Sequence, residues 1–211
     1  MQTSNAVLAC TARAGSNCNL NDCSNFIYSG TSYSSSHEST SVSILSFPLL
    51  SLKNNQRAIL KLMVSTMSVN KTSYLTVLGI RNSSALNLNN NSASWNSLPT
   101  LLNPLASGTA ISSISQNFVN WNSSANFYIA GHFLVNQISN QLKRIDVTDY
   151  VNQVISLGGN QLTFLIYRPF RHPFYNTTSP VLADDLSQGS IVKFYGVNST
   201  NPPSITYFYT A

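Results

Sequence analysis

The sequence contains very few charged residues. Only 8% of its 211 residues are Asp, Glu, Lys or Arg, whereas a folded globular chain usually carries about 25%. Eleven basic residues against six acidic ones leave a formal charge of +5. Spread over a chain of this length, that charge does not form the dense basic face with which nucleic-acid-binding proteins neutralise phosphates. We therefore expect no nucleic-acid partner.

The residue types that most often carry catalysis or bind metals are also scarce. The six acidic residues are accompanied by three histidines, His37, His132 and His172, which lie in separate segments without a metalloprotease-like spacing. The chain has no Gly-x-Ser-x-Gly sequence and no glycine-rich phosphate loop. These absences predict a protein that is not an enzyme, with no catalytic residue, no metal site and no cofactor.

Long hydrophobic runs are missing as well. No stretch reaches the roughly 18 apolar residues that span a bilayer, so we expect no membrane span. The sequence is rich instead in neutral hydrogen-bonding residues, since 26 Asn, 34 Ser and 16 Thr make up 76 of its 211 residues. A surface solvated by amides, hydroxyls or attached glycans does not need ionic charge. This composition favours an extracellular or cell-surface location.

Asparagines in the N-glycosylation pattern Asn-x-Ser/Thr are spread along the chain. They are Asn70, Asn82, Asn90, Asn122, Asn176 and Asn198. A chain this rich in Asn, Ser and Thr contains about six such patterns by chance. The count alone is therefore no evidence, and these residues are candidate acceptors because the composition favours an extracellular protein.

The three cysteines all lie near the start of the chain, at Cys10, Cys18 and Cys23. Their spacing matches no zinc site. They either form one local disulfide and leave one thiol to link chains, or they are three reduced thiols. Residues 1–24 show no sustained hydrophobic period, so we predict an extended N-terminal arm that is stapled by a disulfide or contacts another subunit.

Residues 25–211 alternate between short apolar runs and turn residues, a pattern typical of an all-β sandwich. In Ala58–Val64, for example, every second residue is apolar and Lys61 lies on the opposite face. We predict a jelly-roll-like antiparallel β-sandwich. Its expected strands are Phe26–Tyr33, Val42–Phe47, Ala58–Thr66, Ser73–Ile80, Phe127–Val135, Leu142–Val147, Leu162–Tyr167, Ile191–Tyr195 and Ser204–Tyr209.

One segment has a helical period instead. Apolar residues recur every three to four positions at Val147, Tyr150, Val151, Val154 and Ile155. This predicts one short helix of about two turns, with Thr148 or Asp149 as its cap and Gly158-Gly159 at its end. Asp146 and Asp149 are three residues apart at the start of this helix. We therefore expect their negative charges to stabilise the positive end of the helix dipole rather than to form a catalytic pair. Residues 82–126 are predicted to form mainly long loops.

Five segments stand in a characteristic order: Ala58–Leu62, Tyr74–Leu78, Ser94–Pro99, Ile145–Val151 and Pro203–Tyr207. In this order the chain resembles the DNRLRE-type modules, which are jelly-roll β-sandwiches related to carbohydrate-binding modules. The resemblance covers about residues 25–211, and its most specific parts are the Trp-Asn-x-x-Pro turn at Trp95 and the Asp-Val-Thr sequence at Asp146. It implies a non-catalytic extracellular module that in some members binds polysaccharide. At residues 194–199 the chain departs from the family's Ser-Arg-Glu-like run, and so does not share any binding role that depends on those charges.

Residues 167–175 form the densest group of cationic and aromatic side chains in the chain. Arginine forks bind carboxylates with two hydrogen bonds, and aromatic faces suit sugar rings, so an acidic polysaccharide is a sensible ligand. Two alternatives remain open: a rim loop whose arginines pair with Asp184 and Asp185, and a contact with a neighbouring subunit. The candidate contact residues are Arg168, Phe170, Arg171, His172, Tyr175 and, in its own turn, Trp95.

These features predict a non-catalytic structural subunit of an extracellular, glycosylated filament or surface layer. Its main partner is expected to be another copy of itself, with the N-terminal arm of one subunit docking on the sheet edge of the next. Such an arm predicts that deleting residues 1–24 leaves folded monomers. The alternative is a carbohydrate-binding module that recognises an extracellular polysaccharide, an acidic one included.

Overall fold

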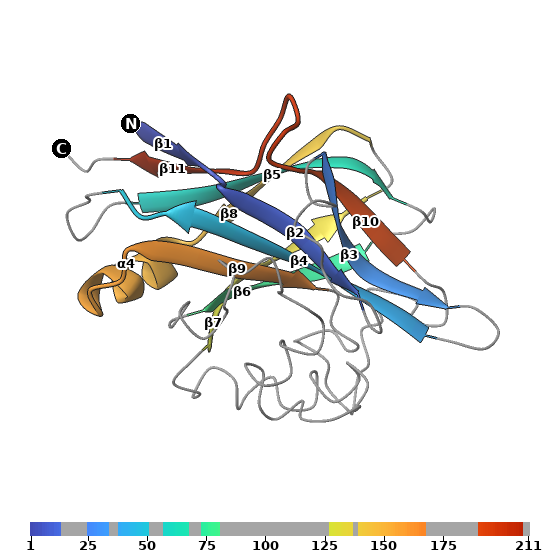
Figure 1. Cartoon of the computed structure of the whole chain (residues 1–211), viewed down its shortest axis with the longest axis horizontal. Coiled ribbons are helices and arrows are strands. Elements are labelled where there is room, and N and C mark those ends of the chain that lie inside the picture. The colour runs from blue at the N-terminus through green and yellow to red at the C-terminus, as the bar shows by residue number, and fades with distance from the viewer. Residues whose placement is uncertain are drawn as a thin grey trace.

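The computed structural model describes residues 1–13, 25–33, 38–50, 57–67, 73–80, 127–136, 139–167 and 190–208. These residues form eleven strands and one helix (Figure 1). The elements are β1 (Gln2–Asn5), β2 (Leu8–Arg13), β3 (Phe26–Tyr33), β4 (Glu38–Pro48), β5 (Arg57–Met67), β6 (Ser73–Ile80), β7 (Phe127–Val135), β8 (Gln141–Asp146), α4 (Thr148–Ser156), β9 (Gln161–Tyr167), β10 (Ser190–Tyr195) and β11 (Ser204–Phe208).

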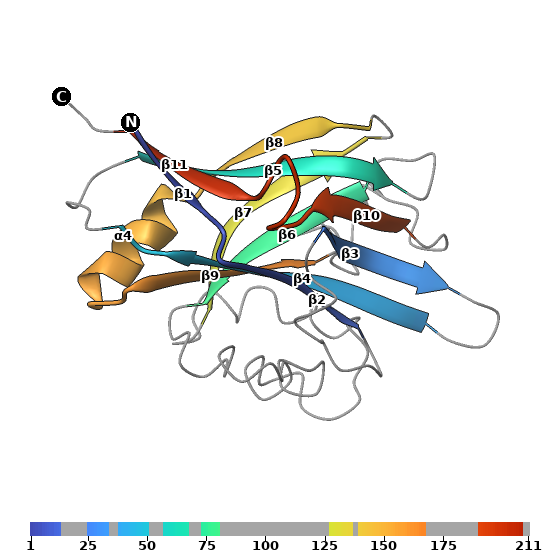
Figure 2. The same ribbon diagram turned by 45° about the horizontal axis from the view of Figure 1, so that its top comes forward.

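All the strands pair antiparallel in one strongly curled sheet. Its order is β1-β11-β5-β10-β3-β4-β9-β6-β7, with β2 added on β4 and β8 added on β5. The curl places β5, β8 and β11 opposite β4, β6 and β9 (Figures 1 and 2). β10 and β3 join these two halves on one side, and β7 lies against β8 on the other. The described residues form the predicted all-β, jelly-roll-like sandwich, with one short helix among them.

The core lies between the two halves and is built by strand alternation. Leu60, Leu62 and Val64 point inward from β5 and are fully buried. They belong to one apolar cluster with Phe47 of β4 and Phe164 of β9, whose rings meet edge to face at 5.8 Å between centroids. Every strand and the helix expected from hydrophobic period are present. β5 and β9 bury a continuous apolar face, whereas β7 and β8 are mostly half-buried. The predicted loops at 82–126 lie outside the described residues.

The N-terminal segment, residues 1–13, differs from the predicted arm. β1 pairs with β11 in one half of the sandwich, and β2 pairs with β4 in the other. Between the two strands, the Ala6 N–H donates to Pro203 O and the Val7 N–H to Ser46 O, each at 2.9 Å. The segment therefore belongs to the sandwich itself, because its backbone groups satisfy two strands of the sheet. Residues 14–24 lie outside the described part.

Helix α4 is held on the sandwich by Tyr150. The buried Tyr150 hydroxyl lies 2.7 Å from Ile80 O and 2.9 Å from Thr163 O, and it accepts the Thr163 N–H at 3.2 Å. Burial raises the pKa of Tyr150 far above its usual value, so the hydroxyl keeps its proton for these carbonyls. The ring packs directly on Gly79 of β6, where an alanine Cβ would lie 2.3 Å from a ring carbon.

No helix among the described residues is long and apolar enough to cross a membrane.

Candidate functional site

The N-terminal segment is the first candidate for a functional contact, because it completes both halves of the sandwich. Ala6, Ala9 and Cys10 are buried, and the Ser4 hydroxyl donates to Pro48 O at 3.2 Å. Val7 lies between β1, which pairs with β11, and β2, which pairs with β4. Its side chain is 64% exposed. The segment thus buries small side chains through backbone pairing and contributes few large apolar contacts.

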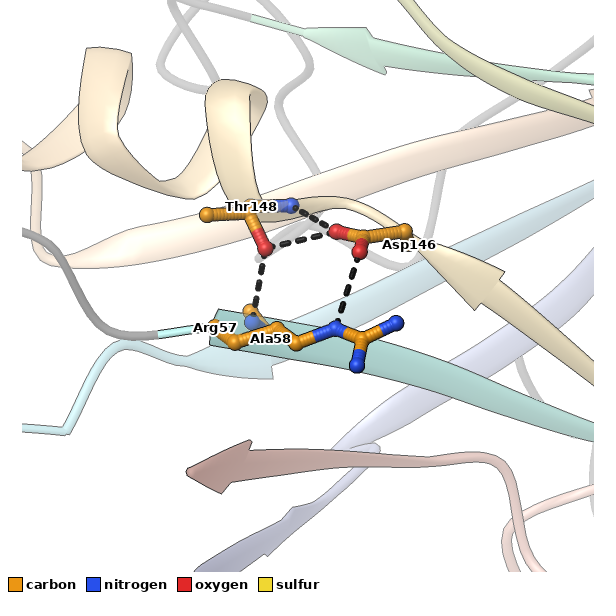
Figure 3. A network of polar contacts seen from close by, with 4 residues as sticks. All are labelled: Arg57, Ala58, Asp146 and Thr148. Carbon is orange, nitrogen blue, oxygen red and sulfur yellow. Dashed lines mark hydrogen bonds and ion pairs between the residues drawn. The ribbon is translucent and has the colours of Figure 1, made fainter. Parts of the chain in front are cut away.

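The second candidate is a polar network where α4 begins (Figure 3). The Thr148 N–H and hydroxyl donate to Asp146 Oδ1 at 3.1 and 2.6 Å, and Arg57 Nε donates to Asp146 Oδ2 at 3.1 Å. The Thr148 hydroxyl also accepts the Ala58 N–H at 2.9 Å. One carboxylate and one hydroxyl therefore tie the start of the helix to β5.

This network corrects the predicted helix cap. The N-cap residue is Val147, whose side chain makes no capping bond. Thr148 and Asp149 are inside the first turn, so neither caps the helix, and Asp146 takes the Thr148 N–H instead. Asp149 does stand in the first turn, where its negative charge favours the helix dipole as expected.

A hollow of about 390 Å³ opens beside the network and is lined by Arg57, Tyr128, Ala130 and residues 146–150. Burial acts to raise the pKa of Asp146, but hydrogen bonds from Thr148 and Arg57 and the Arg57 charge outweigh it and lower that pKa. A carboxylate held in its charged form by these donors is a poor proton donor at neutral pH. The arrangement suits holding α4 on β5 rather than acid–base chemistry.

Replacing Asp146 by asparagine is expected to lower the free energy of unfolding by about 1 kcal/mol at pH 7, because solvent weakens bonds at this exposed site. The lowered pKa means that the carboxylate stabilises the fold above about pH 4 and loses this effect as pH falls. The difference between wild type and Asp146→Asn should therefore vanish in acid.

Urea denaturation at pH 7 and pH 2.5 measures this difference. Asp149→Asn is the matched control, since it removes the same charge three residues further along, in the first turn of α4, and should cost only a few tenths of a kcal/mol. A loss for Asp146→Asn that is equal at both pH values would contradict the role given to the carboxylate.

The third candidate is a basic face of the sheet. The strands β5, β8 and β10 are neighbours (Figure 2). They contain five basic residues that the structure describes: Arg57, Lys61, Lys143, Arg144 and Lys193. Lys61 alternates with core residues, so it points outward, and Arg144 lies directly opposite it on β8. Lys143 is opposite the buried Leu62 and so belongs to the inner face, where burial lowers its pKa.

Aromatic rings continue this outer face. Phe26 of β3 and Tyr195 of β10 are paired in register, with ring centroids 5.5 Å apart. Lys193 Nζ lies 3.7 Å from the centroid of the Phe26 ring. The Tyr195 hydroxyl donates to Asn140 Oδ1 at 3.0 Å. Asn140 precedes β8, and β5 lies between β8 and β10, so the Tyr195 side chain extends across the outer face of β5.

We name this surface the basic outer face and define it as Phe26, Lys61, Asn140, Arg144, Lys193 and Tyr195. Sequence alternation identified Lys61 as outward, but it did not identify the group. Its members come from β3, β5, β8, β10 and the turn before β8. These strands are far apart in the chain, so only the strand register brings them together.

The residues predicted from sequence are placed as follows. Cys10 is buried on β2, and Asn198 is exposed in the turn between β10 and β11. The other predicted site residues lie outside the described residues: Cys18, Cys23, Asn70, Asn82, Asn90, Trp95, Asn122, Arg168, Phe170, Arg171, His172, Tyr175 and Asn176. In the described part of the chain, no group of His, Cys, Asp and Glu is arranged to hold a metal ion.

No protein family matches this chain. No curated protein matches it either. The resemblance to DNRLRE-type modules therefore stays a prediction.

Proposed function

We propose that this protein is a non-catalytic structural subunit of an extracellular, glycosylated filament or surface layer. The observation that carries the proposal is the pairing of residues 1–13 with β11 and β4. The equivalent segment of another copy can make the same backbone pairs, which is the basis of strand exchange between subunits. In the assembly, each subunit would donate this segment to the next.

Strand exchange costs little because the closed and exchanged forms contain the same contacts. The two forms differ in the connecting residues and in the effective concentration of the donor segment. A donor and an acceptor site on different surfaces give a head-to-tail contact, which grows into a fibre when the rotation does not close a ring. The low charge of the chain limits the repulsion between closely packed subunits.

An engineered disulfide between β1 and β11 would distinguish the closed form, in which β1 pairs within its own chain, from the exchanged form, in which β1 pairs with another copy. Asn5 and Ser204 are register partners, Asn5 is exposed, and neither residue belongs to the core. Cα atoms at such paired positions are close enough for a disulfide. We expect oxidised Asn5→Cys/Ser204→Cys protein to run as a covalent ladder on non-reducing gels after assembly, with regular fibres visible by electron microscopy.

The single variants Asn5→Cys and Ser204→Cys are the controls, because each adds a thiol without its register partner. A ladder in either single variant would come from the native cysteines instead. Two results together would refute assembly by strand exchange: electron microscopy shows only dispersed particles, and the oxidised double variant runs only as an internally linked monomer at every protein concentration tested.

A further inference from the structure

The basic outer face contains two like charges that lie directly opposite each other. Lys61 of β5 and Arg144 of β8 are register partners on the same side of the sheet. Such a pair destabilises a sheet unless a negative charge lies nearby. The one ion pair within the described residues joins Asp146 to Arg57, so this carboxylate is already engaged by another cation. An anion from outside the chain would relieve the repulsion.

The aromatic part of the face is already held in place. Lys193 lies over the Phe26 ring, Phe26 contacts Tyr195, and the Tyr195 hydroxyl is fixed by Asn140. Side chains that are fixed before binding lose little entropy when a ligand arrives. Both residues are half-buried rather than fully buried, and a flat ring suits the apolar face of a sugar.

The two parts of the face are close enough for one extended ligand. Phe194, which precedes Tyr195, pairs with Val64 of β5, and Val64 is three residues from Lys61 on the same strand. At about 3.3 Å per residue this separation is about 10 Å. A chain molecule lying along β5 would therefore meet the aromatic pair first and the Lys61–Arg144 pair next.

Charge complementarity limits what this ligand can be. A second copy of the protein is a poor partner, since it has six acidic residues among 211 and carries a net positive charge itself. Duplex DNA carries about one charge per 1.7 Å of its axis, whereas neighbouring outward residues on a strand are about 7 Å apart. Along β5, one pair of cations is followed about 10 Å away by aromatic rings, which fits a polymer of sparse charge and flat rings.

We propose that the basic outer face binds an acidic polysaccharide whose sugar rings carry carboxylate groups. Arg144 donates two hydrogen bonds from its planar fork to a carboxylate, and Lys61 adds a second positive charge. Tyr195 supplies the stacking surface next to the Phe26 ring, over which Lys193 lies, and Asn140 is a hydrogen-bonding neighbour. The face includes no residue of the N-terminal segment, so binding and assembly can succeed or fail independently.

The test measures the binding of polygalacturonate oligosaccharides to the full chain by calorimetry at low and physiological salt. We expect Lys61→Gln/Arg144→Gln to weaken binding at least about tenfold. Arg144→Gln alone should weaken it severalfold. Lys143→Gln is the matched control, because it removes the same charge from the adjacent residue on the inner face, and it should change the affinity less than about twofold.

Further probes identify the ligand class. Neutral glucan oligosaccharides of equal length should bind at least about tenfold more weakly than polygalacturonate. Oligothymidylate that binds as tightly as polygalacturonate would overturn the proposal in favour of a single-stranded nucleic-acid site. Equal losses for Lys143→Gln and Arg144→Gln, or no polygalacturonate binding by wild type, would also overturn it. Folded state is checked by the urea midpoint of each variant.

Discussion

Replacing Gly79 by alanine is expected to lower the free energy of unfolding by about 3 kcal/mol or more. The new Cβ would lie 2.3 to 2.6 Å from three atoms of the Tyr150 ring. Carbon atoms do not approach so closely, so the ring must move. The expected loss is larger than that of ordinary overpacking because this ring also positions a hydroxyl with three backbone partners.

The neighbours of Tyr150 leave no easy route for its displacement. Its ring packs edge to face against Phe164 at 4.9 Å and stacks near Tyr128 at 6.3 Å. Moving the ring would leave Ile80 O and Thr163 O buried without the hydroxyl that they bind. Each buried carbonyl left unpaired costs about 1 to 3 kcal/mol. A small substitution on β6 should therefore loosen α4 as well.

Urea denaturation of Gly79→Ala, monitored by tyrosine fluorescence and circular dichroism, measures the loss. Gly158→Ala is the control, since its Cβ meets no atom within 4 Å and only its φ of +70° causes strain. This control should cost about 1 kcal/mol. In a Tyr150→Leu background the Gly79→Ala change should cost much less, because the clash is gone. Equal costs in both backgrounds would contradict direct packing of Tyr150 on Gly79.

The part of this fold that sequence predicts well is the part whose strands bury a regular apolar face. β5 shows this clearly, since its even-numbered residues from 58 to 64 are apolar and buried. β1 and β2 gave no such signal. Ser4, Ala6 and Ala9 are buried there, but they are small or polar side chains that look like loop residues in the sequence. Their burial comes from backbone pairing with distant strands, which composition does not reveal.

The candidate surfaces show the same limit. The helical period predicted α4, but it did not predict that Asp146 rather than Thr148 or Asp149 would bind the first free N–H. That choice depends on Arg57 and Ala58 of β5, which meet the helix only in the folded chain. The pairing of Lys61 with Arg144 likewise depends on register. Register is set by which apolar faces meet across the whole sandwich.

Removing residues 1–13 is expected to destabilise the sandwich by about 5 kcal/mol, or about 15 °C in melting temperature. The deletion uncovers β11 and β4 along the edges that β1 and β2 occupy. It also removes the buried Ala6, Ala9 and Cys10 from their sites. A detached arm would predict that the deletion leaves a folded monomer of unchanged stability. We expect a loss of stability instead, because the segment is part of the sheet.

A synthetic peptide of residues 1–13 should restore the lost stability when it is added to the deletion variant. Binding to the folded state alone raises the melting temperature with peptide concentration. A peptide with Ala9→Asp is the first control, since it places a charge at a fully buried position and should not rescue. A peptide with Val7→Asp is the second, because Val7 is exposed, and it should rescue nearly as well as the native peptide.

Rescue in trans is the property that strand exchange requires, because it shows that the segment can enter a sandwich to which it is not covalently attached. If the native peptide rescues and the full-length chain still forms no fibres, the segment is a separable part of a monomer and assembly must be abandoned. If the deletion variant melts at the same temperature as the full chain, β1 and β2 contribute no stability. Strand exchange would then lack the binding energy that a fibre needs.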